Sequence, residues 1–353
     1  MAATLHDNSH IEQVPSFYTP LQVTQWLDRI SYPNKTPVTE TEISSGTFPI
    51  NLETLTTLVR VHLVAFPFEN TAMHYTPDHD MDVTPEGVFD RLVSEKKGKG
   101  SYCFGQNTLL LGMLRGLGYR AYPSAGRVNK SPPYLKHPNY EPMSHMIIFV
   151  QPIVNSNQTY LVDAGFGGSG PSRPILLSDA TDNVVKGTAP PEEHRLTRGP
   201  HPDCSRERPH SGSTGTCSLD WRLETRNGIK FPDWHILYAF GEAEFYQPDF
   251  ESLSFSVAKR PGPGIFWQSV ICIKHFWVSS EDGGRKEDGC LGKYVMFGGK
   301  VKREIGGEEE AIIDELKDEA ERIQVLRETF GLQLEDGVES HIEGRDAALK
   351  SKK

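Results

Sequence analysis

The sequence predicts an α+β protein in which helices come first along the chain and strands follow. Within residues 16–95, apolar side chains recur at helical spacing, as in the stripe of Leu55, Leu58 and Val59. Beyond residue 118, short runs rich in β-branched and aromatic residues alternate with turn-forming residues, which is typical of strands. The 353 residues are 37% apolar, so the chain can form two or three packed units.

Four helices are predicted in the first 118 residues. Thr84 is a suitable N-cap for the third helix, because its hydroxyl can accept a hydrogen bond from the first turn. Gly118 suits the end of the fourth, since glycine adopts the left-handed conformation of a helix C-terminus without strain. The four helices are expected from Pro20 to about residue 30, at 52–64, at 85–92 and from Cys103 to Gly118.

The remainder of the chain is predicted to contain strands, an inserted loop and one last helix. Residues 179–218 are rich in Pro, Gly, Ser, His and charge, which indicates a long loop. The last helix is expected to include Ile312 and Leu326 and to end near Phe330, and the polar tail from Asp336 is expected to be loose. The strands are expected at 120–128, 143–150, 159–163, 218–224, 254–257 and 270–278.

The composition excludes several classes of protein. A net charge of −10 argues against nucleic-acid binding and against a basic membrane-surface protein. The five cysteines are an odd number without a disulfide pattern, and no apolar run approaches the roughly 18 residues that span a bilayer. The first 20 residues lack the apolar core of a signal peptide, so a cytoplasmic location is expected. The His and Cys residues of 201–217 have the spacing of no standard zinc site, and no metal is predicted.

Three residues, Cys103, His145 and Asp163, have local contexts that suit a nucleophile, a base and a group that orients the base. Cys103 lies where a glycine-bearing loop leads into a helix, and the positive end of the helix dipole favours the reactive thiolate. His145 is predicted to open a strand and Asp163 to close the next, with a turn at 155–157 between them. Such a hairpin would let Asp163 hydrogen-bond the imidazole and stabilise its protonated form.

Each of these three residues also has an ordinary structural explanation. A cysteine before a helix is commonly a small buried apolar residue, and a histidine in a strand commonly belongs to the core. An aspartate at the end of a strand commonly caps a turn. The residues alone therefore support the catalytic and the structural interpretation about equally.

The segment around Cys103 resembles the nucleophile motif of the arylamine N-acetyltransferase family. That motif is Arg-Gly-Gly-aromatic-Cys-Phe-Glu-x-Asn, and residues 99–107 are Lys-Gly-Ser-Tyr-Cys-Phe-Gly-Gln-Asn. Further segments that resemble the family follow in order, so that the likeness extends over residues 26–331. They include Pro-Phe-Glu-Asn at 67–70, Ser-His at 144–145, Tyr-Leu-Val-Asp-x-Gly-Phe-Gly at 160–167 and Pro-Asp-Phe at 248–250.

The resemblance implies a three-part cysteine-transferase fold. An N-terminal helical bundle is expected at 1–95, and a C-terminal α/β lid with a polar tail at 226–353. The central β-barrel is expected at 96–225, where it would carry the catalytic residues and the inserted loop near 179–218. The loop itself resembles the long interdomain segment of eukaryotic members.

The resemblance also implies an activity, that of an acyl-CoA-dependent N-acyltransferase acting on aromatic amines and hydrazines. Cys103, His145 and Asp163 would form the catalytic triad, and Cys103 would carry the acyl group as a thioester in a ping-pong reaction. Acetyl-CoA is the first expected co-substrate, with propionyl- and malonyl-CoA as alternatives that the sequence leaves open, and no tightly bound cofactor is expected. Substrate contacts are expected near Phe104, whose backbone N–H can steady an oxyanion, and near Gly126 and Ser144.

Three positions depart from the family motif. Lys99 stands in place of the motif arginine, Ser101 in place of the second glycine and Gly105 in place of the glutamate. Lysine cannot reproduce the bidentate pair of a guanidinium with a carboxylate. Two other functions are compatible with the sequence, a transglutaminase-like thiol hydrolase and a degenerate, non-catalytic family member that binds ligands.

Overall fold

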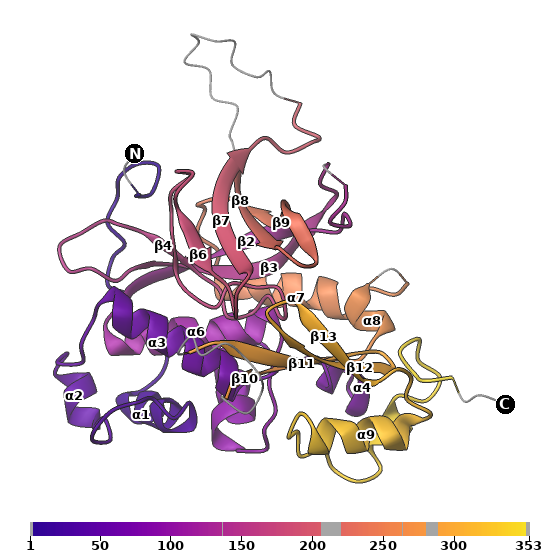
Figure 1. Ribbon diagram of the computed structural model, residues 1–353. Coiled ribbons are helices and arrows are strands. Elements are labelled where there is room, and N and C mark those ends of the chain that lie inside the picture. The colour runs from indigo at the N-terminus through magenta and orange to yellow at the C-terminus, as the bar shows by residue number, and fades with distance from the viewer. Residues whose placement is uncertain (1–2, 136, 206–219, 263, 280–288, 351–353) are drawn as a thin grey trace.

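The computed structural model describes residues 3–135, 137–205, 220–262, 264–279 and 289–350. Figure 1 shows a helical N-terminal part, a strongly curved large sheet above it, and a smaller sheet beside the C-terminal helix. The predicted α+β class and its three-part arrangement are confirmed. Within the described ranges, no helix is long and apolar enough to span a membrane.

The predicted N-terminal helices are present, and two of the predicted end signals are used. The Thr84 side chain accepts a hydrogen bond from the Gly87 backbone, and Gly118 ends its helix with φ of 99°. The helices are α1 (Pro20–Arg29), α2 (Glu40–Ser44), α3 (Leu52–Ala65), α4 (Ala72–Tyr75), α5 (Pro85–Phe89), the π-helix η1 (Asp90–Ser94), α6 (Cys103–Leu117), α7 (Gln247–Ala258), α8 (Ile265–Gln268), α9 (Glu319–Glu328) and the 3₁₀ helix η3 (Val338–His341).

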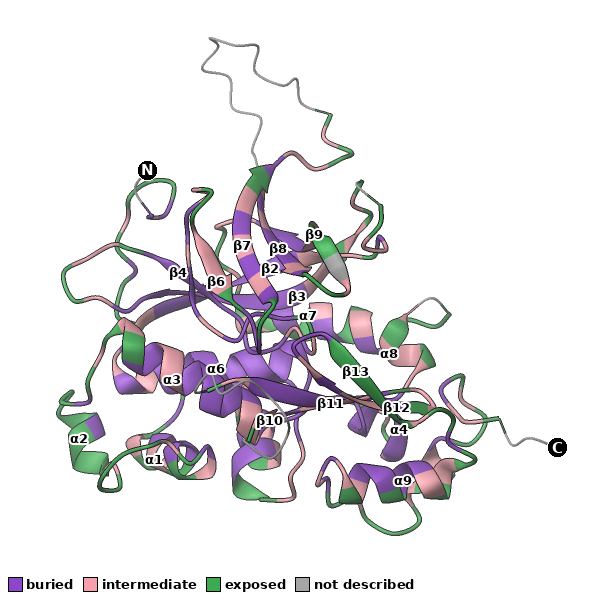
Figure 2. Ribbon diagram, viewed as in Figure 1, coloured by how far each residue is buried: buried purple, intermediate pink, exposed green. Residues whose placement is uncertain are grey.

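Helix α6 is the central element of the fold. Thirteen of its fifteen residues are buried, so it has no solvent-facing stripe and must be covered on all sides. It packs against α1 and α5 and against the strands β2 (Arg120–Asn129) and β3 (Tyr140–Gln151). Figure 2 shows it almost entirely in the colour of buried residues. The residue that begins this helix, Cys103, is therefore fixed by the main core.

The large sheet has eight antiparallel strands in the order β5-β4-β3-β2-β9-β8-β7-β6. Its curvature gives the barrel-like part in Figure 1. The inward faces carry a second apolar cluster that includes Phe149, Trp221 and Phe240. The strands not yet placed are β4 (Tyr160–Val162), β5 (Ile175–Leu176), β6 (Val184–Lys186), β7 (Glu192–Gly199), β8 (Asp220–Asn227) and β9 (Phe231–Phe240).

The small sheet joins the N-terminal part to the C-terminal part. Its order is β1-β10-β11-β12-β13, and Phe68 of β1 pairs with Ile273 of β10. Phe68 also bridges Ser101, so the loop before Cys103 continues the edge of this sheet. The strands are β1 (Phe68–Glu69), β10 (Ile271–Trp277), β11 (Leu291–Phe297), β12 (Lys300–Ile305) and β13 (Glu308–Ile313).

The predicted strand at 254–257 is wrong, because these residues belong to helix α7. The alternation of small and apolar residues there has the period of a strand. However, Phe250, Ser254 and Ala258 are the buried residues of the helix, and they are spaced four residues apart, which is the spacing of one helical face. Pro248 in the first turn is a helix signal that the prediction did not use.

The last helix is shorter than predicted. It begins at Glu319, where the Asp318 side chain caps it, whereas Ile312 lies in strand β13. Strand β13 is an exposed edge strand, as Figure 2 shows, so its few apolar residues could not reveal a buried face. The tail from Asp336 is not loose, because Ile342 is fully buried in the cluster that covers the small sheet.

The predicted loop at 179–218 contains the strands β6 and β7. Strand β7 pairs with β8 along its whole length, and its buried His194 and Leu196 alternate with more exposed residues. The polar residues of the outer face gave this segment the composition of a loop. Residues 206–218 of the predicted insertion lie outside the described part of the chain.

Candidate active site

Cys103 is the first residue of helix α6, as the sequence predicted. The side chain of the N-cap residue, Tyr102, accepts no hydrogen bond from the first turn, so it leaves the first N–H groups of the helix available to other acceptors. The Cys103 thiol is buried, and its Sγ lies 3.7 Å from the backbone oxygen of Ser144. The start of this helix is therefore a site at which negative charge on sulfur or on a bound oxygen is stabilised.

The hairpin of β3 and β4 brings His145 to Asp163. Ile148 pairs with Val162, so the two residues lie near the same end of the hairpin. The distance from His145 Nε2 to Asp163 Oδ2 is 2.7 Å, and both side chains are buried. His145 lies inside β3 rather than at its start, because the strand begins at Tyr140, three residues before the predicted strand at 143–150.

The electrostatics of this group favour a protonated imidazole. Burial by itself lowers the pKa of His145, but the charge and hydrogen bond of Asp163, together with the adjacent Cys103, outweigh it and raise the pKa. Burial also acts against ionisation of Asp163, and the His145 charge reverses that effect, so the Asp163 pKa is lowered. The arrangement therefore suits a thiolate at Cys103 beside an imidazolium ion.

Asp163 is held by neighbours on three elements. Asn107, one turn after Cys103 on α6, donates to Asp163 Oδ1 at 3.0 Å. The Tyr238 hydroxyl of β9 donates to Oδ2 at 3.0 Å, and the Gly165 backbone donates to Oδ1 at 2.8 Å. Burial and the Asp163 charge raise the pKa of Tyr238, so its phenol stays neutral and remains a donor. These bonds fix the carboxylate that orients His145.

The loop after Asp163 approaches the start of α6 closely. A Cβ at Gly165 would lie 2.6 Å from the Cα of Cys103, so a side chain at this position would push the two segments apart. On the other side, the ring of Phe166 meets the imidazole of His145 edge-on, with centroids 5.2 Å apart. The Gly-Phe pair of the family segment therefore allows the approach and packs the histidine.

A buried ion pair fixes the loop that leads to Cys103. Glu69 of β1 is fully buried and accepts from Arg91 at 2.5 Å and from the Gly100 backbone at 3.1 Å. Arg91 in turn donates to the Gly100 carbonyl at 2.7 Å. Among the residues that the structure describes, Lys99, which replaces the motif arginine, pairs with Glu95, four residues earlier in the chain. The carboxylate and guanidinium thus hold the cysteine loop from the helical part of the fold.

The two other departures from the family motif are complementary in space. A Cβ built at Gly105 would lie 2.1 Å from the Ser101 hydroxyl oxygen, so the serine fills the space that a side chain at 105 would need. Ser101 is fully buried, and its hydroxyl has no hydrogen-bond partner among the described residues. The glycine at position 105 therefore leaves the space that the serine side chain at position 101 occupies.

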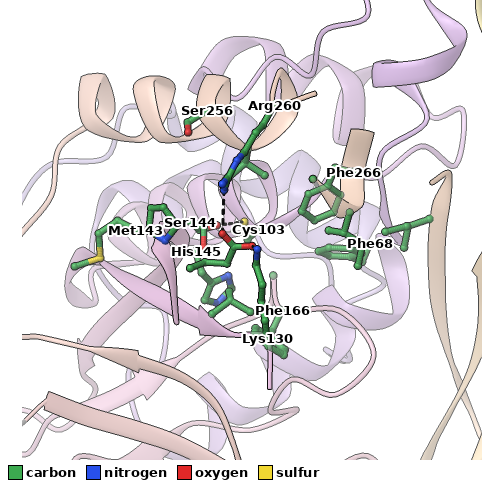
Figure 3. A pocket seen from close by; sticks show the side chains of 18 of the residues that line it. Phe68, Cys103, Lys130, Met143, Ser144, His145, Phe166, Ser256, Arg260 and Phe266 are labelled. Carbon is green, nitrogen blue, oxygen red and sulfur yellow. Dashed lines mark hydrogen bonds and ion pairs between the residues drawn. The ribbon is translucent and has the colours of Figure 1, made fainter. Parts of the chain in front are cut away.

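Cys103 and His145 open onto a cavity of about 580 Å³. Its wall is largely apolar and aromatic, with Phe68, Phe166 and Phe266 among the residues that line it. Figure 3 shows Phe68 and Phe266 on one side of Cys103, Phe166 near His145, and Arg260 reaching toward Cys103 from the end of α7. A cavity of this size and character can hold an aromatic ring together with a thioester.

Of the three predicted substrate contacts, one lines the described wall of the cavity and two do not. Ser144 lines the cavity, next to His145. Phe104 is fully buried with its ring against Tyr102 and Phe250, and it is not among the lining residues that the structure describes. Gly126 pairs with His145 inside the sheet and is also not among them. The side chain at 104 turns to the core because helix α6 is covered on all sides.

Several residues of the site were not identified as functional from the sequence. No sequence motif marks Tyr238 or Arg91. Tyr238 contacts a residue far away in the chain, and Arg91 binds the backbone carbonyl of Gly100. Glu69 and Asn107 lie in the family-like segments but were assigned no role. Among the residues that the structure describes, no group of three His, Cys, Asp or Glu side chains could hold a metal ion, and His210 and Cys217 lie outside that part.

The chain matches the model of an N-acetyltransferase family over residues 51–338. It is 28% identical over 331 residues to N-malonyltransferase FDB2 of Fusarium pseudograminearum, with 91% of each chain covered. A stretch of 158 residues is 35% identical to an arylamine N-acetyltransferase of Mycobacterium bovis, which covers 44% of this chain and 49% of the relative.

Solved structures agree with these sequence relatives. The arylamine N-acetyltransferase of Mycobacterium marinum superposes with a TM-score of 0.66 and is 25% identical, with 91% of this chain and 98% of that chain covered. The same enzyme in complex with CoA gives a TM-score of 0.64 and 26% identity, with the same coverage. With the match of the family model, these findings show that the chain belongs to the arylamine N-acetyltransferase family.

Proposed function

We propose that this protein transfers an acyl group from a coenzyme A thioester to an aromatic amine or hydrazine, with Cys103 as the nucleophile. The observation that carries the proposal is the arrangement of Cys103, His145 and Asp163 at the wall of an apolar cavity. Membership in the family and the CoA complex of the M. marinum relative support the nature of the donor. The aromatic wall supports an aryl acceptor.

In the first half-reaction, the Cys103 thiolate attacks the thioester carbonyl. The oxyanion forms near the start of α6, where the Phe104 backbone N–H and its neighbours can stabilise it. The bond from carbon to the sulfur of coenzyme A then breaks, and the leaving thiolate takes the proton of the His145 imidazolium. Free coenzyme A, a neutral His145 and an acyl thioester on Cys103 remain.

In the second half-reaction, the amine enters the same cavity and attacks the acyl carbonyl. His145, now neutral, accepts a proton from the attacking nitrogen, and Asp163 stabilises the imidazolium that forms. The bond between the carbonyl carbon and Sγ breaks, which releases the amide and restores the ion pair of Cys103 and His145. Two half-reactions through one cavity require ping-pong kinetics.

Two of the finer assignments are part of this proposal. Acetyl-CoA is the donor that the sequence resemblance suggests, whereas the Fusarium relative bears the name of an N-malonyltransferase, which favours malonyl-CoA as a second candidate. A cytoplasmic location is proposed on the sequence alone.

Initial-rate kinetics test the function. With acetyl- or malonyl-CoA varied against an aniline such as 4-methoxyaniline, we expect parallel double-reciprocal lines and one amide formed per coenzyme A released. A thiol hydrolase would release coenzyme A at the same rate without the amine. Folded protein that neither forms amide nor releases coenzyme A with either donor would contradict the proposal and support the non-catalytic alternative.

A further inference from the structure

The wall of the active-site cavity carries an excess of positive charge in front of Cys103. Lys130 and Arg260 are the lysine and arginine residues among the described residues that line it, and Glu141 is the carboxylate. Glu141 bridges the two cations, with Arg260 Nη1 at 3.1 Å from one carboxylate oxygen and Lys130 paired with the other. Two cations thus share one anion, which leaves one positive charge uncompensated within this cluster.

The three charged residues come from two different parts of the fold. Lys130 directly follows β2 and Glu141 lies on β3, whereas Arg260 follows the end of α7. Figure 3 shows Arg260 and Lys130 approaching the space in front of Cys103 and Ser144 from opposite sides. Their side chains are 46% and 40% exposed, so both remain accessible from the opening of the cavity.

Apart from Cys103 and His145 themselves, the rest of the described wall offers a carboxylate only neutral polar side chains, those of Asn129, Ser144 and Ser256. Aromatic and aliphatic side chains dominate it, and a carboxylate buried against them without a partner would be strongly unfavourable. The hydrogen bond of Arg260 to Glu141 uses one of the five N–H donors of the guanidinium, so a second carboxylate can still be bound in a bidentate manner. Burial and the charge of Arg260 lower the pKa of Lys130, which agrees with two cations that repel one another.

We propose that Arg260, assisted by Lys130, binds the free carboxylate of a dicarboxylic acyl donor such as malonyl-CoA and so selects it over acetyl-CoA. This inference rests on the proposed acyl transfer through Cys103. In a malonyl thioester, one methylene group separates the carboxylate from the reacting carbonyl, so a contact to the carboxylate also orients the carbonyl toward the sulfur. Glu141 competes for the same guanidinium and sets how strongly the donor is held.

The test is the ratio of kcat/KM for malonyl-CoA to kcat/KM for acetyl-CoA, measured as acylation of Cys103. Arg260→Gln should lower this ratio by about 10- to 100-fold, the range for a hydrogen-bonded charge pair. Lys130→Gln should lower it less, and Glu141→Gln should raise it, because the competing carboxylate is gone. Lys35→Gln, an exposed lysine outside the cavity, is the matched control and should leave the ratio unchanged.

Coenzyme A also carries phosphates, so the same ratio is measured with the malonyl and acetyl thioesters of N-acetylcysteamine, which have none. A ratio that falls in Arg260→Gln with both sets of donors supports the contact to the acyl carboxylate. A loss that is equal for malonyl- and acetyl-CoA and absent with the short thioesters assigns the cations to the phosphates and overturns the inference. A ratio unchanged by Arg260→Gln, in protein that still acylates, overturns it too, whereas absence of acylation in the wild type rejects the proposed function instead.

Discussion

Replacing Asp163 by asparagine should lower kcat/KM for acyl transfer by a factor on the order of 10³ to 10⁴, as the loss of the orienting carboxylate does in other triads. The asparagine keeps the size of the side chain but removes the charge that raises the pKa of His145. Burial then dominates and lowers that pKa, so the imidazole is neutral at pH 7 and the Cys103 thiolate loses its counter-ion.

The rate of alkylation of Cys103 by iodoacetamide, measured from pH 5 to pH 9, checks the cause of this loss. In the wild type, the imidazolium persists as the pH rises, until the raised pKa of His145 is passed. In Asp163→Asn, we expect slower alkylation at pH 7. Asp182→Asn, an exposed substitution, is the control and should behave as the wild type. If Asp163→Asn kept its kcat/KM within tenfold of the wild type, Asp163 would not be the orienting group.

Replacing Glu69 by glutamine should lower the free energy of unfolding by about 3–5 kcal/mol, the cost of leaving a buried charge without its partner. Glu69 is fully buried and accepts from Arg91, from Gly100 and from the Thr71 backbone. A glutamine amide offers one acceptor oxygen in place of two and turns an N–H group toward these donors. The stability should be measured by urea unfolding followed by tryptophan fluorescence.

The control for this substitution is Glu95→Gln, which breaks the more exposed pair of Glu95 with Lys99. It should cost less than about 1 kcal/mol, because water solvates both groups. Glu69→Gln should also reduce the rate of Cys103 acylation, because the backbone of Gly100 loses its hydrogen bond to the Glu69 carboxylate. Equal losses of stability in the two variants would show that the ion pair of Glu69 and Arg91 is not what holds the cysteine loop.

The part of the site that could be predicted from the sequence is the part encoded locally. Cys103 begins a strongly apolar helix, and His145 and Asp163 belong to one hairpin, so local signals placed His145 near Asp163. The link of this pair to Cys103 came from the resemblance to the family. Tyr238 reaches Asp163 from a strand 75 residues away, and the pair of Glu69 and Arg91 acts on the backbone of Gly100. The sequence near these residues does not indicate such contacts, so the contacts became visible only in the three-dimensional structure.

The errors in the predicted elements have a related origin. In α7, the residues around Ser254 alternate like a strand, whereas the burial of Phe250, Ser254 and Ala258 shows the helical face. Strand β13, with Ile312, is an exposed edge, and strand β7 is half polar, so neither has the apolar pattern by which strands are recognised. Ile312 lies in strand β13 and Leu316 in the connection before α9, so their helical spacing does not belong to one helix.

The central claim is that Cys103 carries the acyl group, and the mass of the protein after reaction with acetyl- or malonyl-CoA tests it most directly. We predict the addition of one acyl group, located on the peptide that contains Cys103, absent from Cys103→Ala and discharged by an aromatic amine. An acyl group on another residue, or none on folded protein with either donor, would contradict the claim.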